Sequence, residues 1–319
     1  MTSGGWSAVA GAVATLPFLL GGCGDTAEPA APATREVVFP GGPVWAQRST
    51  VHANDRTYDV GPGLVREIDW TPYGLVLGLD DDLVDGEPSY SVFDGKALEP
   101  LPGEVWGGHV VTSADGRYAA WIDRDGPSRP AGQVLQVVAM DMGTGERVFV
   151  SSDGMGGDAG DDLNDRYAES APVVVAISDG KLYWQSAEGG GEAFATDLPS
   201  GDTEAVTGRT LRGLRRTSGW EFTSPDGKHS VDAQVVGKLT VRPTQPDFGF
   251  RWQFQGGWLN AHTMMVLARK EYEAAWDPSA PDRSRGVLLA CDLDARHCRQ
   301  LAHIVGTYEV NFPGVDLEY

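Results

Sequence analysis

The chain has 319 residues, of which 41% are apolar, and it carries 45 acidic against 25 basic side chains, for a formal charge of −20. A surface of this charge repels phosphate backbones and anionic lipid headgroups, which disfavours nucleic acid as a partner. The 42 glycines and 20 prolines indicate many tight turns. This length exceeds that of most single domains but suits one closed all-β domain.

The N-terminal segment has the pattern of an export signal. Residues 6–22 are apolar or small, and this run is too short and too rich in glycine for a comfortable membrane span of about 20 apolar residues. It ends in Leu20-Gly21-Gly22-Cys23, which resembles the lipobox of bacterial lipoproteins. The resemblance implies a signal peptide at 1–22, a diacylglyceryl group on Cys23, and an extracytoplasmic protein anchored to the cell membrane by its lipid.

One feature departs from that family, because residues 1–5 lack the usual Lys or Arg. Either the true start lies elsewhere or the α-amine alone serves. The alternative reading is an ordinary buried cysteine, but the abrupt change to polar sequence after Cys23 favours lipidation. Residues 23–35 comprise the lipidated cysteine and a Pro/Ala linker with too little apolar content to fold. We expect residues 36–319 to form the folded domain. The frequent use of Ala, Gly, Val, Asp and Arg resembles the amino-acid composition of proteins from high-GC bacteria such as actinobacteria.

From residue 36 onward the pattern predicts strands and no helix. Short runs of β-branched and aromatic residues alternate with turn signals, and apolar residues do not recur at helical spacing. A strand, an Asp-Gly turn and a second strand occur at 112–121, 176–184 and 223–231. The glycine of each turn supplies the positive φ that such turns need.

A second hairpin follows an apolar strand and begins with Asp, at 141–146, 197–202 and 292–297. Its spacing, with a further copy at 93–96, fits a repeating unit of about 40–50 residues. Ser-Ala-Asp-Gly-Arg at 113–117 and Ser-Pro-Asp-Gly-Lys at 224–228 resemble the repeats of TolB-like or WD40-like β-propellers. The resemblance implies four-stranded antiparallel blades.

Five units fall at 64–103, 104–152, 171–208, 215–246 and 251–304. The remaining pieces, 36–62 and 306–319, both contain strand-like sequence and would close the ring by sharing one blade. This count predicts six blades. Seven is the alternative, because the insertion 153–170 has room for further strands.

Cys291 and Cys298 flank the last hairpin. A two-residue turn at 294–295 would pair them on neighbouring strands, within disulfide reach and adding about 2 kcal/mol of stability. This pairing suits an oxidising compartment, and we prefer a structural disulfide to a redox or metal pair.

No other motif makes a positive case for a cofactor. The acidic run 153–165, with Asp158, Asp161 and Asp162, is a weak Ca²⁺ candidate, and a solvated loop is the preferred reading for it and for 80–85. None of the six histidines has metal-ligand spacing, although His109 and His262 fall where they could face a central channel. We interpret the recurring tryptophans as residues that pack between blades. The alternative is that they form a carbohydrate-binding surface.

These features lead us to expect a monomeric binding or scaffolding module, with a protein or carbohydrate partner on one face. A hydrolase or lyase with its site at the channel mouth is the alternative, and a purely structural envelope protein is the third possibility.

Overall fold

The chain divides into two compact units, Met1–Ala33 and Thr34–Tyr319. The computed structural model describes residues 33–53, 55–80, 88–130, 132–156, 162–187, 192–215, 221–224, 228–232, 240–242, 252–260, 262–269, 284–306 and 309–313. The predicted lipidation site Cys23 lies outside these residues. Within them, no helix has the length and apolar character needed to cross a membrane.

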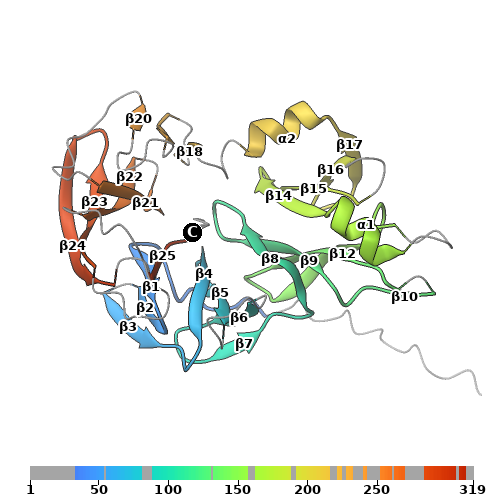
Figure 1. Ribbon diagram of the computed structural model, residues 1–319, viewed down its shortest axis with the longest axis horizontal. Coiled ribbons are helices and arrows are strands. Elements are labelled where there is room, and N and C mark those ends of the chain that lie inside the picture. Colours follow the sequence, from blue (N-terminus) through green and yellow to red (C-terminus); the bar gives the residue numbers. More distant parts are fainter. Residues whose placement is uncertain are drawn as a thin grey trace, which may run out of the picture. The chain divides into compact units, whose positions relative to one another are not determined.

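The second unit consists mainly of antiparallel sheets, which Figure 1 shows along the chain. The sheet β4-β5-β6-β7 comprises Leu64–Thr71, Gly74–Asp80, Ser89–Phe93 and Leu98–Pro100. The sheet β8-β9-β12-β13 comprises Val105–Thr112, Tyr118–Asp123, Gln136–Asp141 and Glu146–Ser151, and the hairpin β10-β11, Ser128–Arg129 and Gly132–Gln133, lies between its middle strands in sequence. The sheet β14-β15-β16-β17 comprises Val173–Ser178, Lys181–Gln185, Ala193–Asp197 and Thr203–Val206.

Two further sheets follow. The sheet β18-β19-β20 has three described strands, Glu221–Thr223, Ser230–Asp232 and Thr240–Arg242. The sheet β21-β22-β23-β24 comprises Trp252–Trp258, Thr263–Arg269, Arg285–Asp292 and His297–Val305. Each of the five units predicted between residues 64 and 304 therefore corresponds to one sheet.

Both ends of the second unit contribute to one sheet, which we call the terminal sheet. In the order β25-β1-β2-β3 it comprises Val310–Asn311, Val44–Gln47, Thr50–Ala53 and Arg56–Asp59. Strand β25 pairs antiparallel with β1, placing Asn311 opposite Ala46 and Val310 opposite Gln47. The expectation that the two terminal pieces share one sheet is confirmed.

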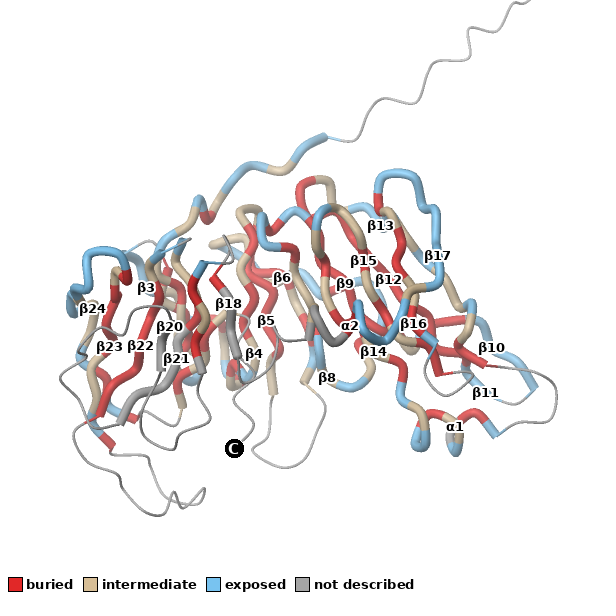
Figure 2. The backbone as a smooth tube through the Cα atoms, turned by 90° about the horizontal axis from the view of Figure 1, so that it is seen from above, coloured by how far each residue is buried: buried red, intermediate tan, exposed pale blue. Residues whose placement is uncertain are grey.

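The sheets bury both of their faces against neighbouring sheets, which explains why their central strands read as continuous apolar runs. In β5, Leu75 and Leu77 pack toward the terminal sheet, whereas Val76 between them packs toward the β8–β13 sheet. Trp121 and Trp184 are fully buried in the apolar clusters on the two sides of the β8–β13 sheet. Figure 2 shows the strands largely buried and the turns exposed.

The repeated turn motifs of the sequence have repeated geometry. Ser113 lies at the start of the turn between β8 and β9. It donates its backbone N–H to the Tyr118 carbonyl over 2.9 Å, and its Oγ accepts the Tyr118 N–H over 2.9 Å. Ser224 makes the same two bonds to His229, over 2.8 and 2.9 Å. Identical bonding at equivalent places shows that these units repeat in structure as well as in sequence.

The leading aspartate of the second hairpin caps its own turn. In four sheets its Oδ1 accepts the backbone N–H of the second residue after it, of the third, or of both, over 2.8–3.2 Å, at Asp94, Asp141, Asp197 and Asp292. Such capping explains why Asp recurs there, because its short side chain reaches the turn amides that the sheet leaves unpaired.

The expectation of no helix is wrong at two places. Helix α1 (Leu163–Glu169) lies in the predicted insertion and buries Leu163 and Tyr167, four residues apart on one face. The Tyr167 hydroxyl donates to the Met155 carbonyl over 2.8 Å and accepts the Leu135 N–H over 3.0 Å. Helix α2 (Gly208–Arg215) buries Leu211 against the β14–β17 sheet. Both helices are too short for a long apolar periodicity to reveal them.

The predicted disulfide is present. Cys291 on β23 lies opposite Cys298 on β24 in the strand register, with the two Cα atoms 4.0 Å apart and the sulfur atoms bonded. Cys291 is fully buried among the apolar residues on the face toward Val231 of β19.

This bond closes a short loop, so its reduction should lower the free energy of unfolding by about 2 kcal/mol. Urea unfolding of the purified protein with and without dithiothreitol measures this difference. The variant Cys291→Ala/Cys298→Ala is the control, because its midpoint should not respond to the reductant. A wild-type midpoint that is also insensitive to dithiothreitol would contradict the assignment.

Candidate functional site

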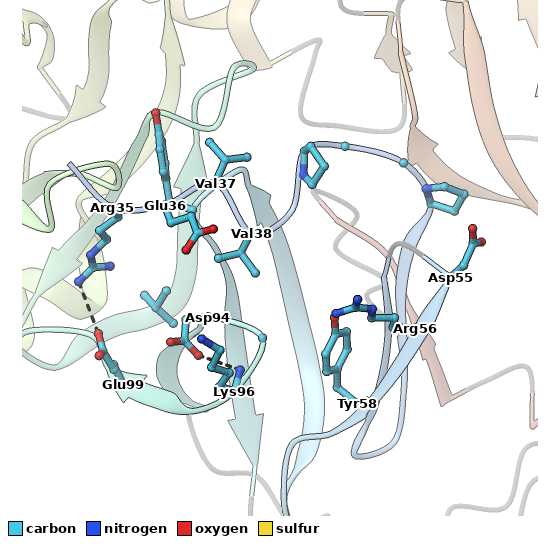
Figure 3. A pocket seen from close by; sticks show the side chains of 17 residues that line it. Arg35, Glu36, Val37, Val38, Asp55, Arg56, Tyr58, Asp94, Lys96 and Glu99 are labelled. Atoms are coloured by element: carbon cyan, nitrogen blue, oxygen red, sulfur yellow. Dashed lines mark hydrogen bonds and ion pairs between the residues drawn. The ribbon is translucent and has the colours of Figure 1, made fainter.

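An open cleft of about 890 Å³ lies beside the point where the chain enters the terminal sheet, a size at the upper end of the usual range for ligand pockets. Its walls come from the irregular segment 35–43, which we call the strap, from the β2–β3 hairpin and from the turns of the β4–β7 sheet (Figure 3). The lining residues are Arg35, Glu36, Val37, Val38, Pro40, Gly41, Gly42, Pro43, Asp55, Arg56, Tyr58, Tyr73, Val92, Asp94, Gly95, Lys96 and Glu99.

The strap is fixed to two sheets before it reaches the third. The Arg35 N–H donates to the Gly143 carbonyl in the β12–β13 turn, and the Val38 and Phe39 N–H groups donate to the Pro72 carbonyl over 2.8 and 3.0 Å. The indole Nε1 of Trp70 in turn donates to the Phe39 carbonyl over 3.1 Å. Phe39 itself is completely buried in the apolar cluster between the terminal sheet and the β4–β7 sheet.

Glycine is required where the strap lies on the β6–β7 turn. Gly95 has φ = +86°, and a Cβ at this position would stand 3.0 Å from Cγ1 of Val38. The absence of a side chain therefore allows both the turn and the close approach of the strap.

Some charges in the cleft are satisfied within the protein. The Arg35 guanidinium lies 3.4 Å from the Glu99 carboxylate. The backbone N–H groups of Ala97 and, to a lesser extent, Lys96 donate to Asp94 and lower the pKa of that carboxyl, so it is ionised at neutral pH.

Other polar groups in the cleft have no partner among the described residues. The side chains of Arg56, Glu36 and Asp55 form no ion pair with any described group, whereas the Lys96 ammonium interacts electrostatically with the Asp94 carboxylate. Figure 3 shows that they come from the strap, from β3 and its preceding turn, and from the β6–β7 turn. The cleft thus offers unpaired charges of both signs to a ligand.

The two tyrosine rings of the cleft are already packed. The Tyr58 ring stands edge-on to Phe93, at 5.2 Å between centroids and 72° between planes, and to Phe39 at 6.2 Å and 79°. The Tyr73 ring lies against Gly143, where an added Cβ would stand 3.1 Å from it.

The sites predicted from sequence do not converge on this cleft. Asp158 and Asp161 lie outside the described residues, and Asp162 is exposed and directly precedes α1. The described residues hold no group of three or more His, Cys, Asp or Glu side chains able to bind a metal ion. His109 and His262 are both exposed, and the disulfide belongs to another sheet.

Sequence reasoning missed the cleft because its residues come from turns that only the sheet packing brings together. From the sequence, Arg35 is assigned to the linker, and residues 36–62 are interpreted only as a piece with strand-like sequence. One available signal was Pro-Gly-Gly-Pro at 40–43, which interrupts any strand between Phe39 and Val44.

A carboxylate outside the cleft was also not singled out. Asp123 is fully buried at the end of β9 and accepts hydrogen bonds from the backbone N–H groups of Glu104 and Asp125, over 2.9 and 3.0 Å, and from Gln136 Nε2 over 3.0 Å. These donors satisfy the charge, so we assign Asp123 a structural role.

Comparisons with known proteins place the chain among distant structural neighbours. No known family matches it, and no curated protein is significantly similar. Among solved structures it is similar to TolB from Acinetobacter baumannii, at 15% identity and a TM-score of 0.41, over 86% of this chain and 66% of TolB. It is also similar to a puromycin-hydrolyzing peptidase from Mycobacterium tuberculosis, at 11% identity and a TM-score of 0.33, over 85% of this chain and 47% of the peptidase.

A third neighbour is the β-propeller domain of the Trilobed protease from Pyrococcus furiosus, at 8% identity and a TM-score of 0.29, over 76% of this chain and 72% of that domain. The chain thus spans just under two thirds of TolB and about half of the peptidase.

Proposed function

We propose that this protein is a membrane-anchored, extracytoplasmic β-propeller that binds a ligand in the cleft beside the strap. The architecture is supported by the sheets themselves, because successive sheets follow each other along the chain and the terminal sheet joins its two ends. In this proposal the five four-stranded sheets and the β18–β20 sheet are six blades of one ring. A seventh blade is disfavoured, since the insertion that left room for it contains α1.

The membrane anchor rests on the sequence. The lipobox-like Leu20-Gly21-Gly22-Cys23 precedes a Pro/Ala linker that joins the strap directly. The disulfide between Cys291 and Cys298 agrees with an oxidising environment outside the cytoplasm.

The observation that carries the binding function is the set of unpaired groups in the cleft. Arg56, Glu36 and Asp55 have no ion-pair partner among the described residues, although acidic side chains greatly outnumber basic ones in the chain. Other cations of the described residues do pair with carboxylates, among them Arg35, Arg48, Arg66, Arg117, Arg124, Arg147 and Lys181. Unpaired charges of both signs at one hollow are what a polar ligand would use.

Replacing Cys23 with Ser removes the acyl acceptor, so the protein should move from the membrane to the soluble fraction. Immunoblotting of both fractions measures the shift, and Cys298→Ser is the control that should stay with the membrane. If Cys23→Ser also remains membrane-bound, the anchor is not at this residue.

A photo-crosslinking phenylalanine analogue placed at position 96, in the cleft, should form an adduct in intact cells. The same analogue at position 179 is the control, because Asp179 is exposed in the first turn of the β14–β17 sheet and does not line the cleft. Mass spectrometry of the purified protein detects the adduct. Adducts that are absent at position 96, or equally frequent at both positions, would argue against the cleft as the binding site.

A further inference from the structure

We infer that the ligand of the cleft is an extended peptide segment of a partner protein, which pairs with the strap through backbone hydrogen bonds. This inference rests on the proposed binding function and names the class of ligand. Three observations support it: the unpaired backbone of the strap, the exposed side chain that it carries, and the charges on the facing walls.

The strap presents backbone groups that the described structure leaves unpaired. Between Arg35 and Val38, whose N–H groups bond to Gly143 and Pro72, the N–H groups of Glu36 and Val37 form no hydrogen bond with any described residue. The carbonyl oxygens of Glu36 and Val37 likewise accept none. Figure 3 shows this part of the strap as a drawn-out segment along the cleft. Free donors and acceptors on a drawn-out backbone are what an added strand uses.

The side chains around this backbone suit a polypeptide. Val37 is 51% exposed and lines the cleft, so its side chain is accessible to a ligand. Glu36 on the strap and Lys96 on the β6–β7 turn carry opposite charges, and Arg56 adds a cation from β3. A peptide offers apolar, acidic and basic side chains on one backbone and so can meet all of these groups.

A carbohydrate fits these walls less well. Sugar rings commonly bind by stacking on aromatic faces, and the aromatic side chains in the described lining are two tyrosines, Tyr58 and Tyr73, of which Tyr58 also contacts the Phe93 ring. The lining also contains no tryptophan. The features that remain free are backbone groups and charges, which favour peptide recognition.

The test removes a single backbone donor. Val37→Pro deletes the unpaired N–H. The backbone at this position can accept proline, because it belongs to neither a helix nor a strand and its φ is not positive. Val37→Ala is the matched control, since it trims the same side chain and keeps the donor. Because neither change breaks a hydrogen bond of the described structure, both variants should unfold at the wild-type midpoint.

The purified full-length protein in detergent is screened against an array of immobilised peptides of about eight residues, and the best binder is measured by fluorescence anisotropy. We expect Val37→Pro to bind that peptide about tenfold more weakly than Val37→Ala, because the peptide carbonyl loses its partner, whereas the step from wild type to Val37→Ala measures the contribution of the valine side chain alone. Should Val37→Pro lower the unfolding midpoint, Glu36→Pro with Glu36→Ala as its control tests pairing at the opposite edge of the strap, because adjacent N–H groups of an extended segment point to opposite edges.

Equal peptide affinities of the proline and alanine variants would overturn strand pairing with the strap. Binding of oligosaccharides but of no peptide, in a parallel glycan array, would overturn the ligand class while the binding function stands. Absence of binding on both arrays, together with no adduct at position 96, would remove the binding function as well.

Discussion

The pairing of β25 with β1 is the constraint on which the rest of this structure depends. It joins residues from opposite ends of the second unit, and loop-closure entropy opposes such a contact. Burial offsets that cost, because Val310 and Phe312 are almost completely buried between the terminal sheet and the β21–β24 sheet. Hydrogen bonds also orient the two strands relative to their neighbours. Gln47 Nε2 donates to the Val305 and Gly306 carbonyls, and Asn311 Nδ2 donates to the Val65 carbonyl over 2.7 Å.

The candidate site follows from that pairing. Strand β1 must lie beside β25, so the strap leading into β1 has to pass the turns of the β4–β7 and β8–β13 sheets. Burial of Phe39 and the bonds of Val38 and Phe39 to Pro72 fix its far end, and the bond of Arg35 to Gly143 fixes its near end. The part between these attachments keeps its backbone unpaired. The cleft is therefore a consequence of how the chain enters its first sheet.

The sequence predicts what is local and repeated. The turns at Asp94, Asp141, Asp197 and Asp292 are recognisable because each aspartate bonds to amides a few residues away. The disulfide is predictable for the same reason, since a short hairpin fixes the register of Cys291 and Cys298. The pairing of the two terminal pieces is also predictable, because each contains too few strands to form a four-stranded unit by itself.

What the sequence does not reveal depends on contacts between distant segments. Helix α1 is stabilised by Leu163 and Tyr167 packing on the core between two sheets, so its seven residues carry too little periodicity of their own. The cleft combines Glu36, Arg56 and Lys96 from three separate segments, and each of them reads alone as an ordinary surface charge. Only the packing of the sheets gives these residues a common site.

Cysteines at positions 46 and 311 test the terminal pairing most directly, because Ala46 and Asn311 lie opposite each other in the β1–β25 register. In a Cys23→Ser background, Ala46→Cys/Asn311→Cys should form a disulfide under mild oxidation, detected by mass spectrometry of unreduced peptides. The pair Ala46→Cys/His303→Cys, in which position 303 pairs instead with Val287, should form none. Failure of the 46–311 bond in folded protein, or equal bonding in both variants, would contradict the shared terminal sheet.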